Sequence, residues 1–251
     1  MQALADTITG TGTGTGTDLT TGTRMEGEAL YRLMTWLSPA YPIGAFCHSS
    51  GLEWAVEARW VTDRVSAQGW VETWVDHGGG WNDTVMFVHA YRAAAEQSRE
   101  KLDAVTALAA VTHPSAERRL EQLSQGAAFR RAALDSGAAP AFFVPPGGEM
   151  PYPVAVAVMA AGHGIDLSSA LTASLHAATG NLISAAQRLV PLGQTDAQRI
   201  IEALRPSVGA AVARAMALND GDPFDALGGA SPLADLASIL HETQYTRLFR
   251  T

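Results

Sequence analysis

The chain has 251 residues, of which 47% are hydrophobic and 17% are charged, so it can bury the core of one large domain. Its formal net charge of -8 leaves no cationic surplus for phosphates or anionic lipids, so neither nucleic acid nor a membrane is an expected partner. The single cysteine, Cys47, excludes an internal disulfide and fits a reducing cytoplasm.

Residues 1–24 form a tail rich in threonine and glycine. The tract from Thr9 to Thr23 offers almost no apolar side chains to offset the entropy of ordering, so the tail is predicted to be disordered. Its glycines lack the G-x-G-x-x-G spacing and follow no apolar strand, so they do not indicate a phosphate-binding loop. The folded domain is expected to span residues 25–251.

Helical periodicity follows the tail. Apolar residues at helical spacing predict an amphipathic helix over Leu30–Leu37, and Ser38-Pro39 ends it. Another helix is predicted over Gly80–Ala95. Pro114 is expected in the first turn of a helix that leads to Leu120, Leu123 and Ala127.

Strand signals are few. Ala141–Val144 and the alternating valines from Val154 to Val158 have strand character, but neither run has an evident partner strand. Because the second run continues into Met159-Ala160-Ala161, it is predicted to be a buried helix.

The clearest helix is Asp166–Val190, which Asp166 caps and Pro191 ends, with one apolar stripe along its length. Gly180 inside it costs about 1 kcal/mol relative to alanine, so it is expected to permit the close approach of another backbone. Thr195 followed by Gln198 predicts a capping box at the start of the next helix. With a last helix over Leu233–Phe249, the sequence predicts a single-domain, all-α bundle of about ten helices.

The nearest approach to a catalytic motif is His241-Glu242-Thr243-Gln244-Tyr245, which resembles zinc-binding H-E-x-x-H. Tyr245 replaces the second histidine, so His241 and Glu242 are expected on the exposed side of a helix. A helical metal-dependent hydrolase that uses His241, Glu242 and distant ligands is the alternative from the enzyme class. For the adjacent Cys47 and His48 a structural or contact role is favoured over a metal site, for which a dimer would be the main way to bring two such pairs together.

Two groups of aromatic residues are candidates for a core or an interface. Five tryptophans crowd one third of the chain, and a core seam is favoured over a partner-binding face. They are Trp54, Trp60, Trp70, Trp74 and Trp81. Near residue 251, aromatic and guanidinium groups alternate, which suits an interface anchor or a final helix docked on its own domain.

Three segments carry a family resemblance. They are SPAYPIGAF at 38–46, which runs on to SSGLE at 49–53, AAQRLVPLGQ at 185–194 and HETQYTRLFR at 241–250. Together they resemble the F-type urease accessory proteins, helical chaperones that help to load nickel into urease. The resemblance covers the chain from Met25 onward, and the last segment is the most specific.

The resemblance implies an all-helical cytoplasmic adaptor with no catalytic site of its own. Such a protein forms a homodimer, binds the D-type accessory protein (also called H-type) and recruits a nickel-carrying GTPase, UreG, to apo-urease. It holds no cofactor stably, because nickel and GTP are handled by its partners, in keeping with the missing phosphate loop. Carried over by position, the partner-binding residues are Pro42, Gly44, Phe46, His48, Gly51, Glu53, Tyr245, Arg247, Phe249 and Arg250.

The sequence departs from the family pattern at two positions. His48 stands where the family usually has tyrosine, and Ala45 stands where it has a second glycine. Because histidine can change charge near neutral pH, His48 is predicted to weaken GTPase recruitment or to make it pH-dependent. A generic helical interaction domain that shares only packing habits with the family is the third reading.

Overall fold

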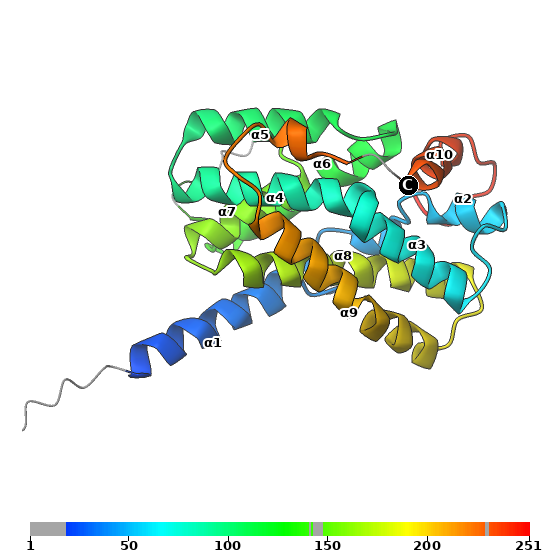
Figure 1. Ribbon diagram of the computed structural model, residues 1–251, viewed down its shortest axis with the longest axis horizontal. Helices are drawn as coiled ribbons and strands as arrows, with labels where there is room; N and C mark the ends of the chain where they lie inside the picture. The colour runs from blue at the N-terminus through cyan, green and yellow to red at the C-terminus, as the bar shows by residue number, and fades with distance from the viewer. Residues whose placement is uncertain (1–18, 141, 143–147, 229–230) are drawn as a thin grey trace, which may run out of the picture.

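The computed structural model of the chain describes residues 19–140, 142, 148–228 and 231–251. Within these residues it has ten α-helices, two short 3-10 helices and no strand, which confirms the predicted all-α class (Figure 1). In chain order the elements are α1 (Leu19–Trp36), η1 (Ala45–Cys47), α2 (Leu52–Glu57), α3 (Arg64–His77), α4 (Gly79–Ala95), α5 (Arg99–Val111), α6 (Ala116–Asp135), α7 (Tyr152–Gly162), α8 (Leu167–Leu189), α9 (Gln194–Met216), η2 (Pro223–Ala226) and α10 (Pro232–His241).

Helix α7 forms the centre of the bundle. It packs against α4, α6 and α8, and every side chain from Pro153 to Ala160 is buried. A helix enclosed in this way is apolar around its whole circumference, so the predicted buried helix is confirmed. Of the other possible strand, Ala141–Val144, only Phe142 lies within the described residues.

The α6–α7 crossing is unusually close. A Cβ atom added to Gly126 of α6 would lie 2.0 Å from the carbonyl oxygen of Met150. Only glycine leaves room for this backbone.

Helix α8 confirms the prediction over Asp166–Val190. Asp166 accepts a hydrogen bond from the Ser169 amide at 2.9 Å, as an N-cap residue does, and the apolar stripe faces inward. The expected role of Gly180 is wrong, because a Cβ atom there would meet nothing within 4 Å.

Two helix starts differ from the prediction. Helix α9 begins at Gln194, because the Gly193 carbonyl accepts from the Ala197 amide at 3.1 Å, so Thr195 is not an N-cap and the predicted capping box is wrong. Helix α6 begins after Ser115, whose hydroxyl accepts from the Arg118 amide at 3.1 Å. Pro114 therefore precedes the helix, because serine can cap it through a side-chain acceptor and proline cannot.

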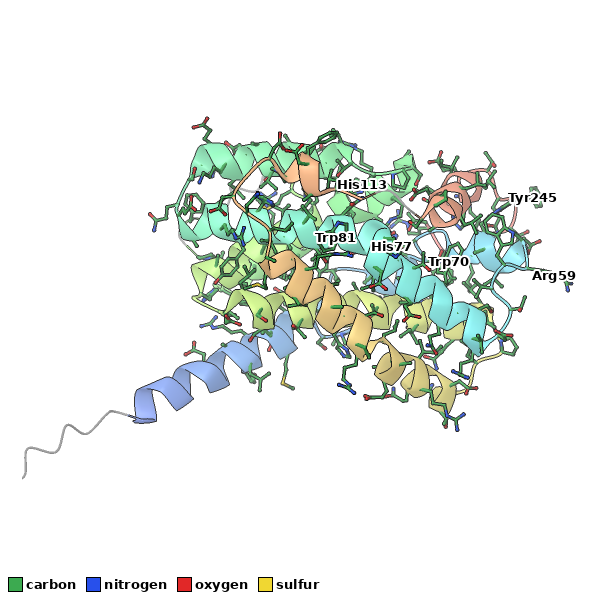
Figure 2. All side chains as sticks on the ribbon, in the orientation of Figure 1. Arg59, Trp70, His77, Trp81, His113 and Tyr245 are labelled. Atoms are coloured by element: carbon green, nitrogen blue, oxygen red, sulfur yellow. The ribbon has the colours of Figure 1, made fainter. Side chains whose placement is uncertain are left out.

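The tryptophans form part of the core, as predicted, with one exception. Trp74 and Trp81 are buried, Trp54 and Trp70 are half-buried, and Trp60 is exposed. Figure 2 shows Trp70 and Trp81 among the packed helices of the body.

Helix α1 projects from one end of the bundle (Figure 1). It begins at Leu19, within the stretch assigned to the tail, and residues 1–18 lie outside the described residues. Leu33 is buried, whereas Leu30 and Met34 are exposed, so only part of the predicted apolar stripe packs inward. Among the described helices, none combines the length and the apolarity that crossing a membrane requires.

Candidate functional site

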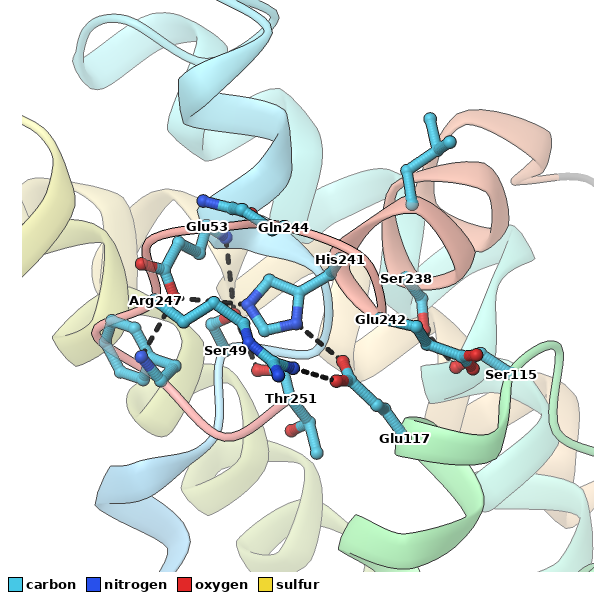
Figure 3. A network of polar contacts seen from close by, with 12 residues as sticks. Ser49, Glu53, Ser115, Glu117, Ser238, His241, Glu242, Gln244, Arg247 and Thr251 are labelled. Carbon is cyan, nitrogen blue, oxygen red and sulfur yellow. Dashed lines mark hydrogen bonds and ion pairs between the residues drawn. The ribbon is translucent and has the colours of Figure 1, made fainter.

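The residues after α10 lie across the starts of α2 and α6 (Figure 3). Helix α10 ends at His241, so the predicted helix over Leu233–Phe249 is too long. Residues 242–251, here called the 242–251 segment, bond to the chain around η1: the Arg250 amide donates to the Cys47 carbonyl at 2.8 Å, and the Ser49 amide donates to the Thr251 carbonyl at 2.7 Å. The segment is therefore seated on its own domain.

Glu53 in the first turn of α2 holds the 242–251 segment. Its buried carboxylate accepts hydrogen bonds from the amides of Leu248 at 2.6 Å and Phe249 at 2.9 Å. These amides satisfy the carboxylate in place of water, so its burial is tolerated. Gly51 brings α10 close enough, because a Cβ atom there would lie 2.7 Å from the Ser238 amide nitrogen.

His241 lies at the centre of this arrangement with no exposed surface. Its Nδ1 is 2.5 Å from a carboxylate oxygen of Glu117, and its Nε2 is 3.2 Å from one of Glu53. Arg247 also bonds to Glu117, at 2.6 Å. The expectation that His241 faces solvent is therefore wrong, because carboxylates from two other helices enclose it.

Thr251 joins the segment to a buried polar cluster. Its hydroxyl donates to Glu121 at 2.8 Å and lies 2.9 Å from Nδ1 of His48. The hydroxyl has one proton, so Nδ1 of His48 is the donor in the second bond. Burial lowers the pKa of His48, although the negative charge of Glu121 opposes the shift. The lowered pKa favours a neutral imidazole at neutral pH.

A buried ion pair on α6 belongs to this polar cluster. Arg118 and Glu121, one turn apart on α6, lie 2.5 Å apart, and Arg118 also donates to the Ser50 hydroxyl at 2.6 Å. Burial acts to raise the pKa of Glu121, but the charges of Arg118 and His48 and the hydrogen bonds from Arg118 and Thr251 together outweigh it and hold the pKa below its ordinary value. Glu121 is therefore a stable anionic acceptor for Thr251.

The metal-site alternatives gain no ligand set. In the part of the chain that the structure describes, no three His, Cys, Asp or Glu side chains are placed to hold a metal ion. Both ring nitrogens of His241 face carboxylates in ion pairs, and Nδ1 of His48 is used by Thr251. The arrangement holds chain segments together.

Comparison with known proteins gives the family. Residues 61–205, more than half of the chain, match the UreF family profile. The chain belongs to the UreF family. Among its curated relatives, a urease accessory protein UreF of Bradyrhizobium sp. (strain BTAi1 / ATCC BAA-1182) is 50% identical over 91% of this chain and 95% of the relative. One of Rhodopseudomonas palustris (strain BisB5), with the same name, is 51% identical over 90% of this chain and 93% of the relative.

The partner-binding residues predicted for this UreF chain divide into two groups around the 242–251 segment. One group is exposed or half-exposed: Pro42, Gly44, Phe46, Tyr245, Arg247 and Arg250. The other group is buried within the chain: His48, Gly51, Glu53 and Phe249. Figure 2 shows Tyr245 pointing away from the body at the end of the molecule that also carries Arg59.

Sequence analysis missed the acidic residues of α6 that complete this region of UreF. Glu117 and Glu121 lie in its first two turns and hold His241, Arg247 and Thr251. The available signal was the run of charges at 117–121, in which Glu117 and Glu121 share one face of a helix.

An exposed apolar surface adjoins the segment. Leu233, Leu236 and Ile239 of α10 are 42–56% exposed, and Leu248 is 65% exposed. Large side chains of this kind that lie together on a protein surface mark interaction sites. This surface, with Tyr245, is here called the α10 surface.

Beneath α10 lies a cavity of about 310 Å³, bordered among others by Asp83, Arg118, His113 and Ser238. Asp83 is half-buried and accepts from the Gln122 side-chain amide at 2.8 Å. Burial raises the pKa of Asp83 to about 7, although Arg118 opposes the shift. The chain thus contains a carboxyl group that is largely protonated in mildly acidic solution.

Asp83→Asn is expected to stabilise the protein at neutral and alkaline pH. The folded state keeps the Asp83 proton between pH 3.8 and about 7 whereas the unfolded state releases it, so wild-type stability is lost as pH rises through this window. Asparagine carries no ionisable proton, so the variant avoids this loss. Above neutral pH its free energy of unfolding should exceed that of the wild type by about 2–4 kcal/mol. Urea unfolding across the window measures the gain. Asp135→Asn at the exposed end of α6 is the control, and a gain that does not change with pH would contradict the assignment.

Proposed function

We propose that this chain is a cytoplasmic chaperone for urease maturation that acts as an adaptor without a catalytic site of its own. It works as a homodimer, binds the D-type accessory protein through the α10 surface, and recruits the nickel-carrying GTPase UreG to apo-urease. Nickel and GTP are handled by the partners, and this chain binds no cofactor stably. The observation that carries the proposal is the exposed α10 surface next to a segment held by buried ion pairs.

The α10 surface supports the contact with the D-type protein. Leucine, isoleucine and tyrosine side chains on a well-seated element present apolar area at a low entropic cost of ordering. Because the 242–251 segment is already held by Glu53 and Glu117, Tyr245 and Leu248 are presented with α10 as one surface. Gly51 and Glu53 are buried, so their role in partner binding is to hold the α10 surface in place.

A second group of residues supports recruitment of the GTPase. Arg188 donates to the Phe46 carbonyl at 2.7 Å, and its guanidinium lies 4.3 Å from the centre of the Phe249 ring. This packing holds Phe46, which is 68% exposed, close to the backbone that carries Arg250. An exposed aromatic ring with a nearby guanidinium is a frequent combination at the centres of protein interfaces. His48 lies beneath them as a neutral support for Thr251, so any pH dependence of recruitment that it causes belongs on the acid side.

The test of the proposal is purification of the chain with the D-type protein and the GTPase, with complex size read by light scattering. A ternary complex containing two copies of this chain is the expected result. Failure of the folded chain to bind either folded partner would overturn the proposal.

Ile239→Glu is expected to weaken binding of the D-type protein by at least about 30-fold, because the interface would bury an unpaired carboxylate. Ile239 is 46% exposed, so the fold should survive, and circular dichroism checks this. Val65→Glu, which is 67% exposed on α3, is the matched control and should bind normally. Arg250→Ala should keep the D-type contact and lose the GTPase. Equal losses in Ile239→Glu and Val65→Glu would show that α10 is not the contact surface.

A further inference from the structure

The imidazole of His241 is held between two carboxylates that come from different helices. Nδ1 lies 2.5 Å from Glu117 of α6, and Nε2 lies 3.2 Å from Glu53 of α2 (Figure 3). A carboxylate can only accept hydrogen bonds, and neutral histidine has a proton on just one nitrogen. Bonding to both carboxylates therefore requires a proton on each ring nitrogen, which is the imidazolium form.

The surrounding charges balance only in this form. The groups facing the ring are Glu53 from α2, Glu117 from α6 and Arg247 from the 242–251 segment. The neighbouring Glu242 is turned away, because its carboxylate accepts from the Ala116 amide at 2.8 Å. Two carboxylates thus meet Arg247 and a charged His241. Loss of one proton would leave a ring lone pair facing a carboxylate in a buried site and an excess of negative charge there.

We infer that the imidazolium of His241 is the positioning group of the 242–251 segment, and that one proton on this ring decides whether the segment is seated. Its partners Glu53 and Glu117 are the same carboxylates that hold the Leu248 and Phe249 amides and the Arg247 guanidinium. When the proton leaves, repulsion between the ring and these carboxylates loosens every one of those bonds.

The inference gives His241 a role in regulation, and this consequence rests on the proposed function. Tyr245, Leu248 and Arg250 belong to the segment that the ring holds. We therefore expect partner binding to be strongest where both ring nitrogens of His241 carry a proton.

The first measurement uses the isolated full-length chain and needs no substitution at the site. Nitrogen-15 spectra of the histidine rings, recorded from mildly acid to alkaline pH, report whether one or both nitrogens of His241 carry a proton. Hydrogen exchange of the Leu248 and Phe249 amides, corrected for the intrinsic pH dependence of exchange, reports whether the segment is seated. Both ring nitrogens should be protonated while these amides are protected, and protection should fall as the ring loses its proton.

Two variants supply the contrast. His241→Gln should reduce the protection of the Leu248 and Phe249 amides by at least about tenfold where both wild-type ring nitrogens carry a proton, the loss expected for one hydrogen bond between charged groups. The protection that remains in this variant should not change with pH. His176→Gln changes an exposed histidine of α8 and should alter neither protection nor its pH profile.

Protected amides beside a singly protonated His241 ring would overturn the inference, as would protection that does not follow the ring. Binding of the D-type protein to wild type and His241→Gln separates this result from the proposed function. If the ring and the amides behave as expected but the partner binds neither protein, the proposed function fails and the positioning role of His241 stands.

Discussion

Glu53→Ala is expected to destabilise the chain by about 3–5 kcal/mol, the range found when one partner of a buried ion pair is removed. The Glu53 carboxylate is the joint acceptor for His241, Leu248 and Phe249, and all three would lose a bond inside a site with almost no access to water. Urea unfolding measures the change in the free energy of unfolding. Trypsin should also cleave after Arg247 and Arg250 in the variant faster than in the wild type, because the 242–251 segment is released.

Glu57→Ala is the matched control for this substitution. Glu57 lies on the same helix but is exposed, so its loss should change stability by less than about 0.5 kcal/mol. If Glu53→Ala were as mild as Glu57→Ala, or if cleavage at the two arginines were unchanged, the 242–251 segment would not depend on Glu53.

Gly126→Ala is expected to destabilise the protein by at least about 3 kcal/mol or to prevent folding, because overpacking at a backbone contact cannot be relieved by a rotamer change. The added methyl group would lie 2.0 Å from the Met150 carbonyl oxygen, so α6 and the chain entering α7 would have to separate. Glu117 and Glu121 are carried by the same helix, so the 242–251 segment should loosen as well. Thermal unfolding, followed by circular dichroism, measures the loss.

Gly180→Ala is the control, and it is expected to stabilise the protein where Gly126→Ala destabilises it. Gly180 also lies inside a helix, but its surroundings are open, so alanine should stabilise α8 by about 0.5–1 kcal/mol through helix propensity alone. Equal effects of the two substitutions would show that the α6–α7 crossing adapts to a side chain.

These two glycines show what sequence reasoning can and cannot predict about the fold. Helical periodicity identified α8, and the continuation of an apolar run into Met159-Ala160-Ala161 identified the buried α7, because both patterns lie within the residues of the helix itself. The need for glycine depends on which backbone crosses the helix, and that partner lies elsewhere in the sequence. Gly180 was therefore expected to lie in a close crossing and is not, whereas Gly126 lies in one and has no local signal.

In the site, too, the sequence did not show which distant residues come together. The family resemblance indicated Glu53, Arg247 and Phe249, and Glu53 and Phe249 do meet in the structure. It did not indicate Glu117, which joins Arg247 to His241, nor that His241 is enclosed. Helical spacing shows which face of α6 carries Glu117, but only tertiary packing shows that this face meets the residues after α10.

The bonds that seat the 242–251 segment also set an order for folding. The Phe249 amide meets Glu53 across 196 positions, and the Thr251 carbonyl meets the Ser49 hydroxyl across 202. Closing such long loops is entropically unfavourable until the intervening helices are packed, so contacts between distant residues form late. We expect the 242–251 segment to dock last, after α2 and α6 are in place. A partner that recognises the seated segment would then also distinguish fully folded molecules from late folding intermediates, and its binding rate would report the final docking step.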